Sequence, residues 1–166
     1  MTQHVLRSGA QRLAETAMAV MLAVMALAVF INVVLRYGFG SGIAASEELS
    51  RLLFVWMVFI GATAAYPLGE HMAFTSLLRP LQSKPMALKA LTRVIHALVL
   101  MACVLVGWGA WQQVVVGLGS KSVVMGYSAA LLPLPAFLCA TAIGVMALLD
   151  LVRGKPIAFD HHAEVE

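Results

Sequence analysis

Residues 46–69, which read SEELSRLLFVWMVFIGATAAYPLG, place three charged side chains directly before an uncharged apolar run. The uncharged run covers residues 52–69, close to the roughly 20 residues that a helix needs to cross about 30 Å of hydrocarbon. Because a charged side chain inside hydrocarbon is costly, we expect Glu47, Glu48 and Arg51 to lie at the edge of the bilayer. The stretch therefore predicts a membrane-spanning helix with a charged entrance.

Three further uncharged runs are long enough to cross a membrane, at residues 16–35, 94–120 and 122–149. They lack the alternation of polar and apolar residues that marks a membrane β-strand, whereas a helix satisfies its backbone hydrogen bonds within the segment. The sequence thus predicts an all-α membrane protein with a single membrane domain over residues 1–166. Its four spans are expected near residues 14–35, 50–68, 92–115 and 129–151.

The composition indicates that lipid surrounds many of the side chains. Of the 166 residues, 61% are hydrophobic and 11% are charged, whereas about a quarter of a soluble domain is charged. The net charge of +3 comes without a cluster of Lys and Arg, so the sequence does not indicate binding to nucleic acid. Cys103 and Cys139 lie inside apolar runs and outside any CxxC pair, which favours two small buried side chains over a disulfide or a zinc site.

The distribution of Lys and Arg predicts the orientation in the membrane. With four spans, the two termini and the connection between the second and third spans share one side. That side and its flanks carry Arg7, Arg12, Arg79, Lys84, Lys89, Arg93, Arg153 and Lys155. The other side has only Arg36, Arg51 and Lys121. Because cytoplasmic loops are enriched in Lys and Arg, we expect both termini in the cytoplasm and the charged entrance at the outer face.

Three kinds of small four-span protein remain open from the residues alone. A haem-binding electron carrier needs facing axial histidines, for which His71 and His96 are the candidates. A stand-alone exporter needs an ionisable group deep in the bilayer, and its best candidate, Glu15, lies at the cytoplasmic end of the first span. A subunit that packs against a partner needs no such group. We favour this third class, because no charged residue lies in the middle of a span.

Two local expectations concern packing. Small residues recur four positions apart, at Ala19 and Ala23, at Gly61 and Ala65, and at Ala140 and Gly144. Such pairs let helices approach closely in lipid, so we expect them at helix–helix contacts. At the charged entrance, Glu47 and Glu48 precede Arg51 by four and three positions, which predicts an ion pair on one helix face, with Ser46 as the N-cap.

Residues 47–78, EELSRLLFVWMVFIGATAAYPLGEHMAFTSLL, closely resemble the signature region of the small permease subunit (DctQ type) of tripartite ATP-independent periplasmic, or TRAP, transporters. The family has an acidic residue, an Arg, a Trp inside an apolar helix, a Gly-Ala step and a Gly-x-His loop. The segments NVVLRYGF at residues 32–39 and LPLPAFLCATAIGVMALLDLVRG at residues 132–154 are also similar to the family. The chain departs from the family after the His, where an Asp is common and Thr75 and Ser76 stand here.

The resemblance implies a scaffold subunit in the bacterial inner membrane, and not an enzyme. Its partners would be a large DctM-type permease, which uses a sodium gradient to import an organic acid, and a periplasmic binding protein that delivers the acid. The subunit itself would need no cofactor. The resemblance also implies an amphipathic interfacial helix before the second span, for which residues 41–53 are the candidate. The residues expected to have structural or partner-interface roles are Arg36, Glu47, Glu48, Arg51, Trp56, Gly61, Gly69 and His71.

Overall fold

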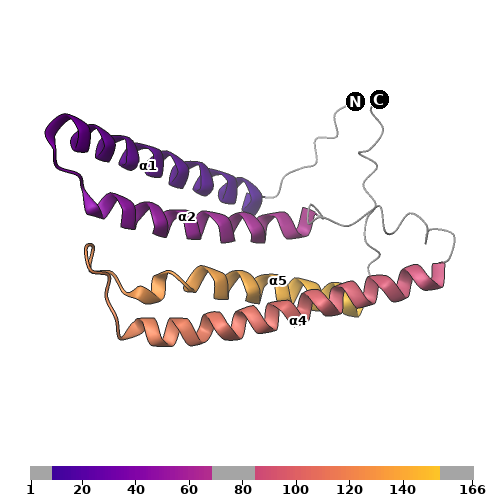
Figure 1. Cartoon of the computed structure of the whole chain (residues 1–166). Helices are drawn as coiled ribbons and strands as arrows, with labels where there is room; N and C mark the ends of the chain where they lie inside the picture. The colour runs from indigo at the N-terminus through magenta and orange to yellow at the C-terminus, as the bar shows by residue number, and fades with distance from the viewer. Residues whose placement is uncertain (1–8, 69–84, 154–166) are drawn as a thin grey trace, which may run out of the picture.

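The computed structural model describes residues 9–68 and 85–153 of the chain, which form long helices (Figure 1). Four of them are long and apolar enough to cross a membrane. The elements are α1 (Gly9–Phe39), α2 (Ala44–Ala65), the 3-10 helix η1 (Tyr66–Leu68), α4 (Pro85–Leu118), the 3-10 helix η3 (Ala129–Leu131) and α5 (Leu134–Arg153). The described ranges contain no β-strand, so the predicted all-α fold with four spans is confirmed.

The expected separate interfacial helix over residues 41–53 is wrong. Residues 41–43 are an extended connection, and Ala44 already begins α2, which continues without a break to Ala65. No Gly or Pro lies between Ala44 and Ile60 that would interrupt the backbone hydrogen bonds of a helix. Glu47, Glu48 and Arg51 therefore belong to the first two turns of the spanning helix itself.

The four long helices lie side by side in the order α1, α2, α5, α4 (Figure 1). The main contacts of α1 are with α2, those of α2 beyond α1 are with α5, and α4 packs on α5 and η3. The first two helices form one antiparallel pair and the last two form another. The contact between α2 and α5 joins the two pairs.

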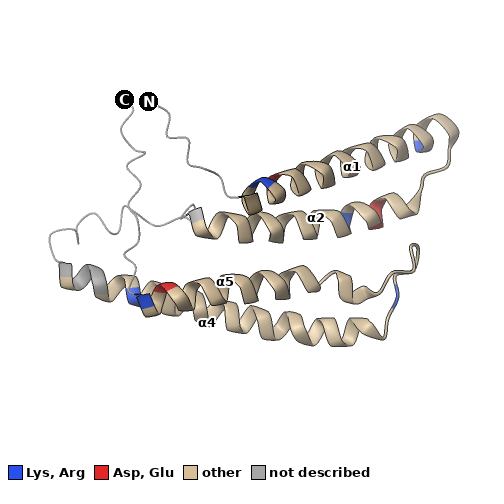
Figure 2. Cartoon of the chain, turned by 180° about the vertical axis from the view of Figure 1, so that it is seen from behind, with Lys and Arg blue, Asp and Glu red and all other residues tan. Residues whose placement is uncertain are grey.

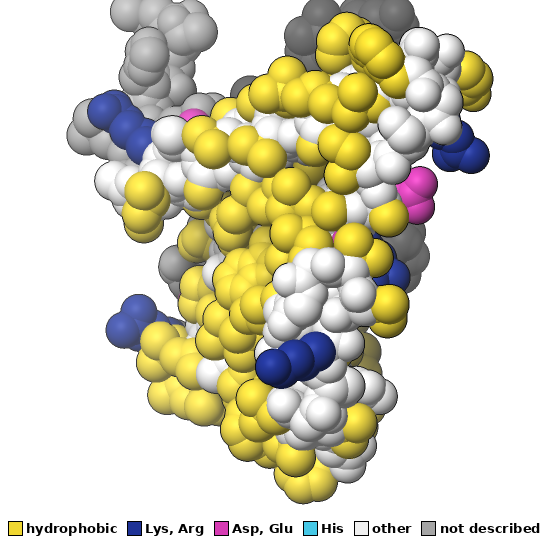
Figure 3. All heavy atoms as spheres, turned by 90° about the vertical axis from the view of Figure 1, so that its left-hand side faces the viewer, with side chains coloured by type: hydrophobic (Ala, Val, Ile, Leu, Met, Phe, Trp, Pro, Cys, Tyr) yellow, Lys and Arg dark blue, Asp and Glu magenta, His cyan; other side chains and the backbone are white. Residues whose placement is uncertain are grey.

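We call the end of the bundle with the connections 40–43 and 119–128 the loop end, and the opposite end the far end. Among the described residues, most of the charged positions lie near these two ends of the bundle (Figure 2). Arg36, Glu48 and Lys121 lie toward the loop end, whereas Arg12 and Arg153 lie toward the far end. Seen from the loop end, much of the molecular surface between the charges is hydrophobic (Figure 3). This distribution is typical of helices that cross a hydrocarbon layer.

Few residues of the four long helices are buried in the contacts between them. In the most apolar 18-residue windows, 0% of the residues are buried in α1 and α2 and 6% in α4, but 33% are buried in the span Ala129–Arg153, which η3 and α5 form together. Helix α5 is therefore the centre of the packing. The buried apolar side chains are mostly small: Ala110, Val114, Ala130, Cys139, Ala140, Ile143 and Ala147. Small side chains let helices approach closely where lipid removes the usual hydrophobic drive to associate.

The expectation about small residues is met at two of the three pairs. A Cβ on Gly144 would lie 3.4 Å from the Cβ of Cys103 on α4, and a Cβ on Gly61 would lie 3.1 Å from Sδ of Met18 on α1. Ala140 is buried beside Gly107 of α4. For the remaining pair, Ala19 and Ala23, the prediction of a helix contact is wrong, because both side chains are exposed on α1. That face of α1 points away from α2.

Candidate functional site

The first polar contacts at the loop end join the start of α2 to α1. Ile43 is the N-cap residue of α2 and has no side chain that can cap a helix. Asn32 of α1 supplies the acceptor, because the backbone N–H of Ile43 donates to its Oδ1 at 2.6 Å. Ser46 is buried, and its hydroxyl donates to the carbonyl of Ala28 at 2.9 Å. Ser46 is therefore not the predicted N-cap; it ties α2 to α1.

The connection before α2 passes close to the last turns of α1 at Gly42. A Cβ on Gly42 would lie 3.1 Å from Oδ1 of Asn32 and 3.7 Å from Cβ of Arg36. The first carbon atoms of the Arg36 side chain therefore lie close to this connection, although the side chain as a whole is exposed. A larger residue at position 42 would push against the amide that caps α2, so the Gly belongs to the same contact as Asn32.

The connection between α4 and α5 is a tight hairpin. The backbone N–H of Ser122 donates to the carbonyl of Tyr127 at 2.8 Å, and that of Ala129 donates to the carbonyl of Ser120 at 3.0 Å. The hairpin turns through Gly126, whose φ of +71° lies in the left-handed region that favours glycine. The hairpin therefore has a defined backbone that can present a fixed set of N–H groups.

Glu48 of α2 binds this hairpin. Its Oε2 accepts a hydrogen bond of 2.8 Å from the backbone N–H of Met125, which lies 77 positions further along the chain. The side chain of Ser122 and the backbone of Val124 also interact favourably with the carboxylate. A carboxylate that accepts several N–H and O–H donors makes stronger bonds than a neutral acceptor would. Glu48 thus holds the connection of one helix pair against the first helix turns of the other.

The prediction of an ion pair between Arg51 and Glu47 or Glu48 is wrong. Within residues 9–68 and 85–153, no salt bridge within 4 Å joins Arg51 to Glu47 or Glu48, and Arg51 is exposed. Arg51 and Glu48 attract each other only at longer range. The physical reason is that the Glu48 carboxylate is occupied by the hairpin. The proposed role of Arg51 at a partner interface stays a prediction.

Trp56 makes the second link between the two helix pairs. Its indole Nε1–H donates to the carbonyl of Leu131, at the end of η3, with a distance of 3.0 Å. The α-helical partner of that carbonyl would be the N–H of residue 135, but this residue is Pro135, which has no N–H. The indole supplies the missing donor. Trp56 is therefore a structural residue of α2 that completes the start of α5.

Gly117 is a close-contact residue that the sequence reasoning missed. A Cβ at this position would lie 2.5 Å from the backbone N of Ala130 and 2.7 Å from its Cα, so the last turn of α4 touches the backbone of η3 directly. The Ser128 hydroxyl donates to the Gly117 carbonyl at 3.2 Å and also caps η3. The GLG sequence at residues 117–119 could have signalled a close approach, but the partner lies in another element.

Gly69 and His71 lie outside the described residues, so their expected roles stay predictions. His96, the other haem-ligand candidate, has its Nδ1 2.8 Å from the carbonyl of Thr92, one turn earlier in α4. Glu15 interacts with another group and lies in the first turns of α1, near the far end. The described part of the chain holds no group of three or more His, Cys, Asp or Glu side chains that could bind a metal ion. The arrangement is one of links between helices.

The sequence of residues 25–156 matches the family described as the DctQ component of tripartite ATP-independent periplasmic transporters. The chain belongs to the DctQ family. A Haemophilus influenzae protein provisionally named as a TRAP transporter small permease protein is 39% identical over 105 residues, which cover 63% of this chain and 64% of that protein. A second H. influenzae protein with the same provisional name is 30% identical over 132 residues, which cover 80% of this chain and 79% of that protein.

Membership of the DctQ family agrees with the four apolar helices and makes the chain a membrane component of a transport system. The family match covers Asn32, Glu48 and Trp56 together with the 119–128 hairpin, so the links described above lie inside the DctQ region. The match to the first H. influenzae relative covers just under two thirds of that protein. The alternatives of a haem carrier and of an exporter gain no support from either comparison.

Proposed function

We propose that this chain is the scaffold subunit of a TRAP transporter and packs against a large DctM-type permease in the bacterial inner membrane. In this proposal the large permease imports an organic acid with a sodium gradient, and a periplasmic binding protein delivers the acid. The observation that carries the proposal is the DctQ match over residues 25–156 in a chain whose four apolar helices carry their charges near the two ends.

The packing supports a scaffold in preference to a self-contained transporter. Ion-coupled transport needs ionisable or coordinating groups near the middle of the bilayer. In this chain the stretches 16–35, 52–69, 94–120 and 122–149 contain no Asp, Glu, Lys or Arg. Four polar side chains, those of Asn32, Ser46, Glu48 and Trp56, bind backbone atoms of neighbouring elements. They are used for holding helices together.

The proposed orientation places the loop end at the periplasm and both termini in the cytoplasm. It rests on the excess of Lys and Arg in the termini and in the connection between α2 and α4. In this orientation the 119–128 hairpin and its anchor Glu48 face the side from which a binding protein would deliver the acid. Cysteines introduced one at a time at Lys121 and at Arg153, and labelled with an impermeant maleimide in intact cells, would report the orientation.

Reconstitution into liposomes tests the proposed function. We expect sodium-driven uptake of the acid when the chain, its cognate large permease and the binding protein are present together. Omission of the chain should abolish most of the uptake, and the chain alone should show none. Uptake by the chain alone, or full uptake without it, would refute the scaffold role. A Soret absorption band in the purified chain would instead revive the haem-carrier alternative.

A further inference from the structure

A hydrogen bond between α1 and α2 fixes the height of the charged entrance beside α1. The Ser46 hydroxyl donates to the carbonyl of Ala28, and the two helices are antiparallel. Arg51 follows Ser46 along α2, whereas Arg36 follows Ala28 along α1 in the opposite direction. At 1.5 Å per residue, Arg51 therefore lies roughly 15–20 Å below Arg36 along the helix axes. This places Arg51 beside the middle of the uncharged run 16–35 of α1.

The part of α1 next to Arg51 is apolar and exposed. Leu22, Val29 and Val33 follow one another by seven and four positions, so they form one stripe along α1. The stripe lies about a quarter turn from Asn32, which contacts α2. Because both helices are right-handed and antiparallel, it lies on the side of the helix pair that also carries Arg51. The exposed fractions of the three side chains are 54%, 47% and 46%.

We call this side of the α1–α2 pair the entrance face; it consists of Leu22, Val29, Val33, Glu47, Arg51 and Phe54. Neither lipid nor water suits all of it. With the outer bilayer surface at Arg51, about three turns of α1 with exposed apolar side chains stand in water. With that surface at Arg36, the exposed charges of Glu47 and Arg51 lie in hydrocarbon. Within residues 9–68 and 85–153, no salt bridge compensates either charge.

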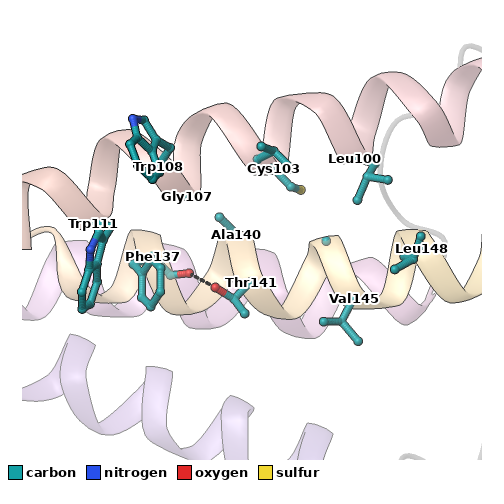
Figure 4. A pocket seen from close by; sticks show the side chains of 12 residues that line it. Leu100, Cys103, Gly107, Trp108, Trp111, Phe137, Ala140, Thr141, Val145 and Leu148 are labelled. Atoms are coloured by element: carbon teal, nitrogen blue, oxygen red, sulfur yellow. Dashed lines mark hydrogen bonds between the residues drawn. The ribbon is translucent and has the colours of Figure 1, made fainter.

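Among the described residues, no charged side chain lines either of the two apolar grooves beside α5. One groove lies between α4 and α5, has a volume of about 500 Å³ and contains the neighbouring rings of Trp111 and Phe137 (Figure 4). The other lies between α2 and α5 and has a volume of about 570 Å³. The hydroxyls of Thr141 and Thr63, one in each groove, donate to carbonyls of their own helices at 2.8 Å. Lipid chains suit both grooves, which distinguishes them from the entrance face.

We propose that the large permease covers the entrance face, with apolar side chains against α1 and with a carboxylate and a cation against Arg51 and Glu47, respectively. This inference rests on the function proposed above. A protein surface can present apolar and charged groups at one depth, which a lipid bilayer cannot. A membrane-embedded partner is required, because the charges lie about three turns below Arg36. Charge pairs at such a contact fix the register between the two subunits.

An exchange of the two charges distinguishes this contact from a pair that Glu47 and Arg51 make with each other. Glu47→Arg combined with Arg51→Glu keeps the net charge and the spacing within α2, but presents reversed charges to the partner. In co-purification of the permease with the tagged chain, we expect this variant to retain about a tenth of the wild-type amount or less. Glu47→Gln combined with Arg51→Gln should retain more than the exchanged variant, because it removes the charges without adding repulsion.

Arg12→Glu combined with Glu15→Arg is the matched control, since it exchanges two charges of α1 at the far end and should retain all of the permease. Full retention by the exchanged entrance variant, or equal losses in the two exchanges, would overturn the inference while the scaffold function stands. Photo-crosslinking covers the case in which a variant folds poorly. Benzoylphenylalanine at positions 29 and 54 should crosslink to the permease, and crosslinks only to lipid would also overturn the inference. If the wild-type chain retains no permease, the proposed function itself fails.

Discussion

The indole of Trp56 donates its N–H to the carbonyl of Leu131, 75 positions away, at a distance of 3.0 Å. Pro135 removes the donor that an α-helix would otherwise offer to this carbonyl. The hydrogen bond therefore joins two features that look unrelated in the sequence, an apolar helix with a Trp and a proline-containing helix start. It also holds the α1–α2 pair to the α4–α5 pair.

Trp56→Phe should lower the stability of the chain by about 1 kcal/mol, because the Leu131 carbonyl loses its donor. Pro135→Ala restores a backbone N–H that can bond this carbonyl. In the double variant the Phe substitution should therefore cost less than it does alone, which a double-mutant cycle of thermal unfolding in detergent will measure. Equal costs in the two backgrounds would show that Trp56 acts by its size and not by its hydrogen bond.

Gly117→Ala should destabilise the chain by about 1–3 kcal/mol, because its Cβ would lie 2.5 Å from the backbone of Ala130. Gly109→Ala is the matched control on the same helix, since nothing lies within 4 Å of a Cβ there. Helix propensity alone favours Ala at both positions. Thermal unfolding should therefore show a lower midpoint for Gly117→Ala and an unchanged or higher one for Gly109→Ala. A similar response of the two would contradict the close contact between α4 and η3.

Glu48→Ala should loosen the 119–128 hairpin. The Met125 N–H then keeps only its longer bond of 3.2 Å to the Ser122 hydroxyl, in place of the 2.8 Å bond to the carboxylate. Hydrogen exchange measured by mass spectrometry should become faster in peptides that cover residues 120–128. Glu47→Ala, which removes an exposed carboxylate one position earlier, should leave that exchange unchanged. If the two variants accelerate exchange equally, the effect comes from charge at the loop end and not from the bond to Met125.

Asn32→Leu should fray the start of α2, because the Ile43 N–H loses its acceptor and no side chain replaces it. Loss of a helix cap costs about 1 kcal/mol, and Asn32→Asp should cost less, because it keeps an oxygen at the same place. Exchange of the amides at residues 43–46, followed in the two variants, distinguishes these outcomes. Equal fraying with Leu and with Asp would mean that the amide group of Asn32 has another role.

Much of the fold could be predicted from the sequence, since it depends on local properties of the chain. Four uncharged runs of the length of a membrane span appear as four long helices, and Gly61 and Gly144 lie at helix contacts as expected. The ends of the helices were less predictable. Helix α1 extends from Gly9 to Phe39 beyond its predicted span at 14–35, because backbone hydrogen bonding continues after the chain leaves the apolar stretch.

The predictions for the charged entrance failed together and for one reason. Ser46, Glu48 and Arg51 are close in sequence, so the sequence favours contacts among neighbours: a cap and an ion pair. In the structure Ser46 binds Ala28 of α1, and Glu48 binds Met125 of the 119–128 hairpin. A single sequence does not indicate contacts between residues that lie 18 or 77 positions apart in the chain.

The sequence by itself determined that the chain is a four-helix membrane protein with charged ends and no charged residue in the middle of its spans. Apolar runs and charge positions are local, and lipid selects helices from them. Only the tertiary structure decided the order α1, α2, α5, α4, the use of Trp56 and Glu48 as links, and the two grooves beside α5. These depend on which helix faces meet, and that choice is made by the fit of side chains far apart in the sequence.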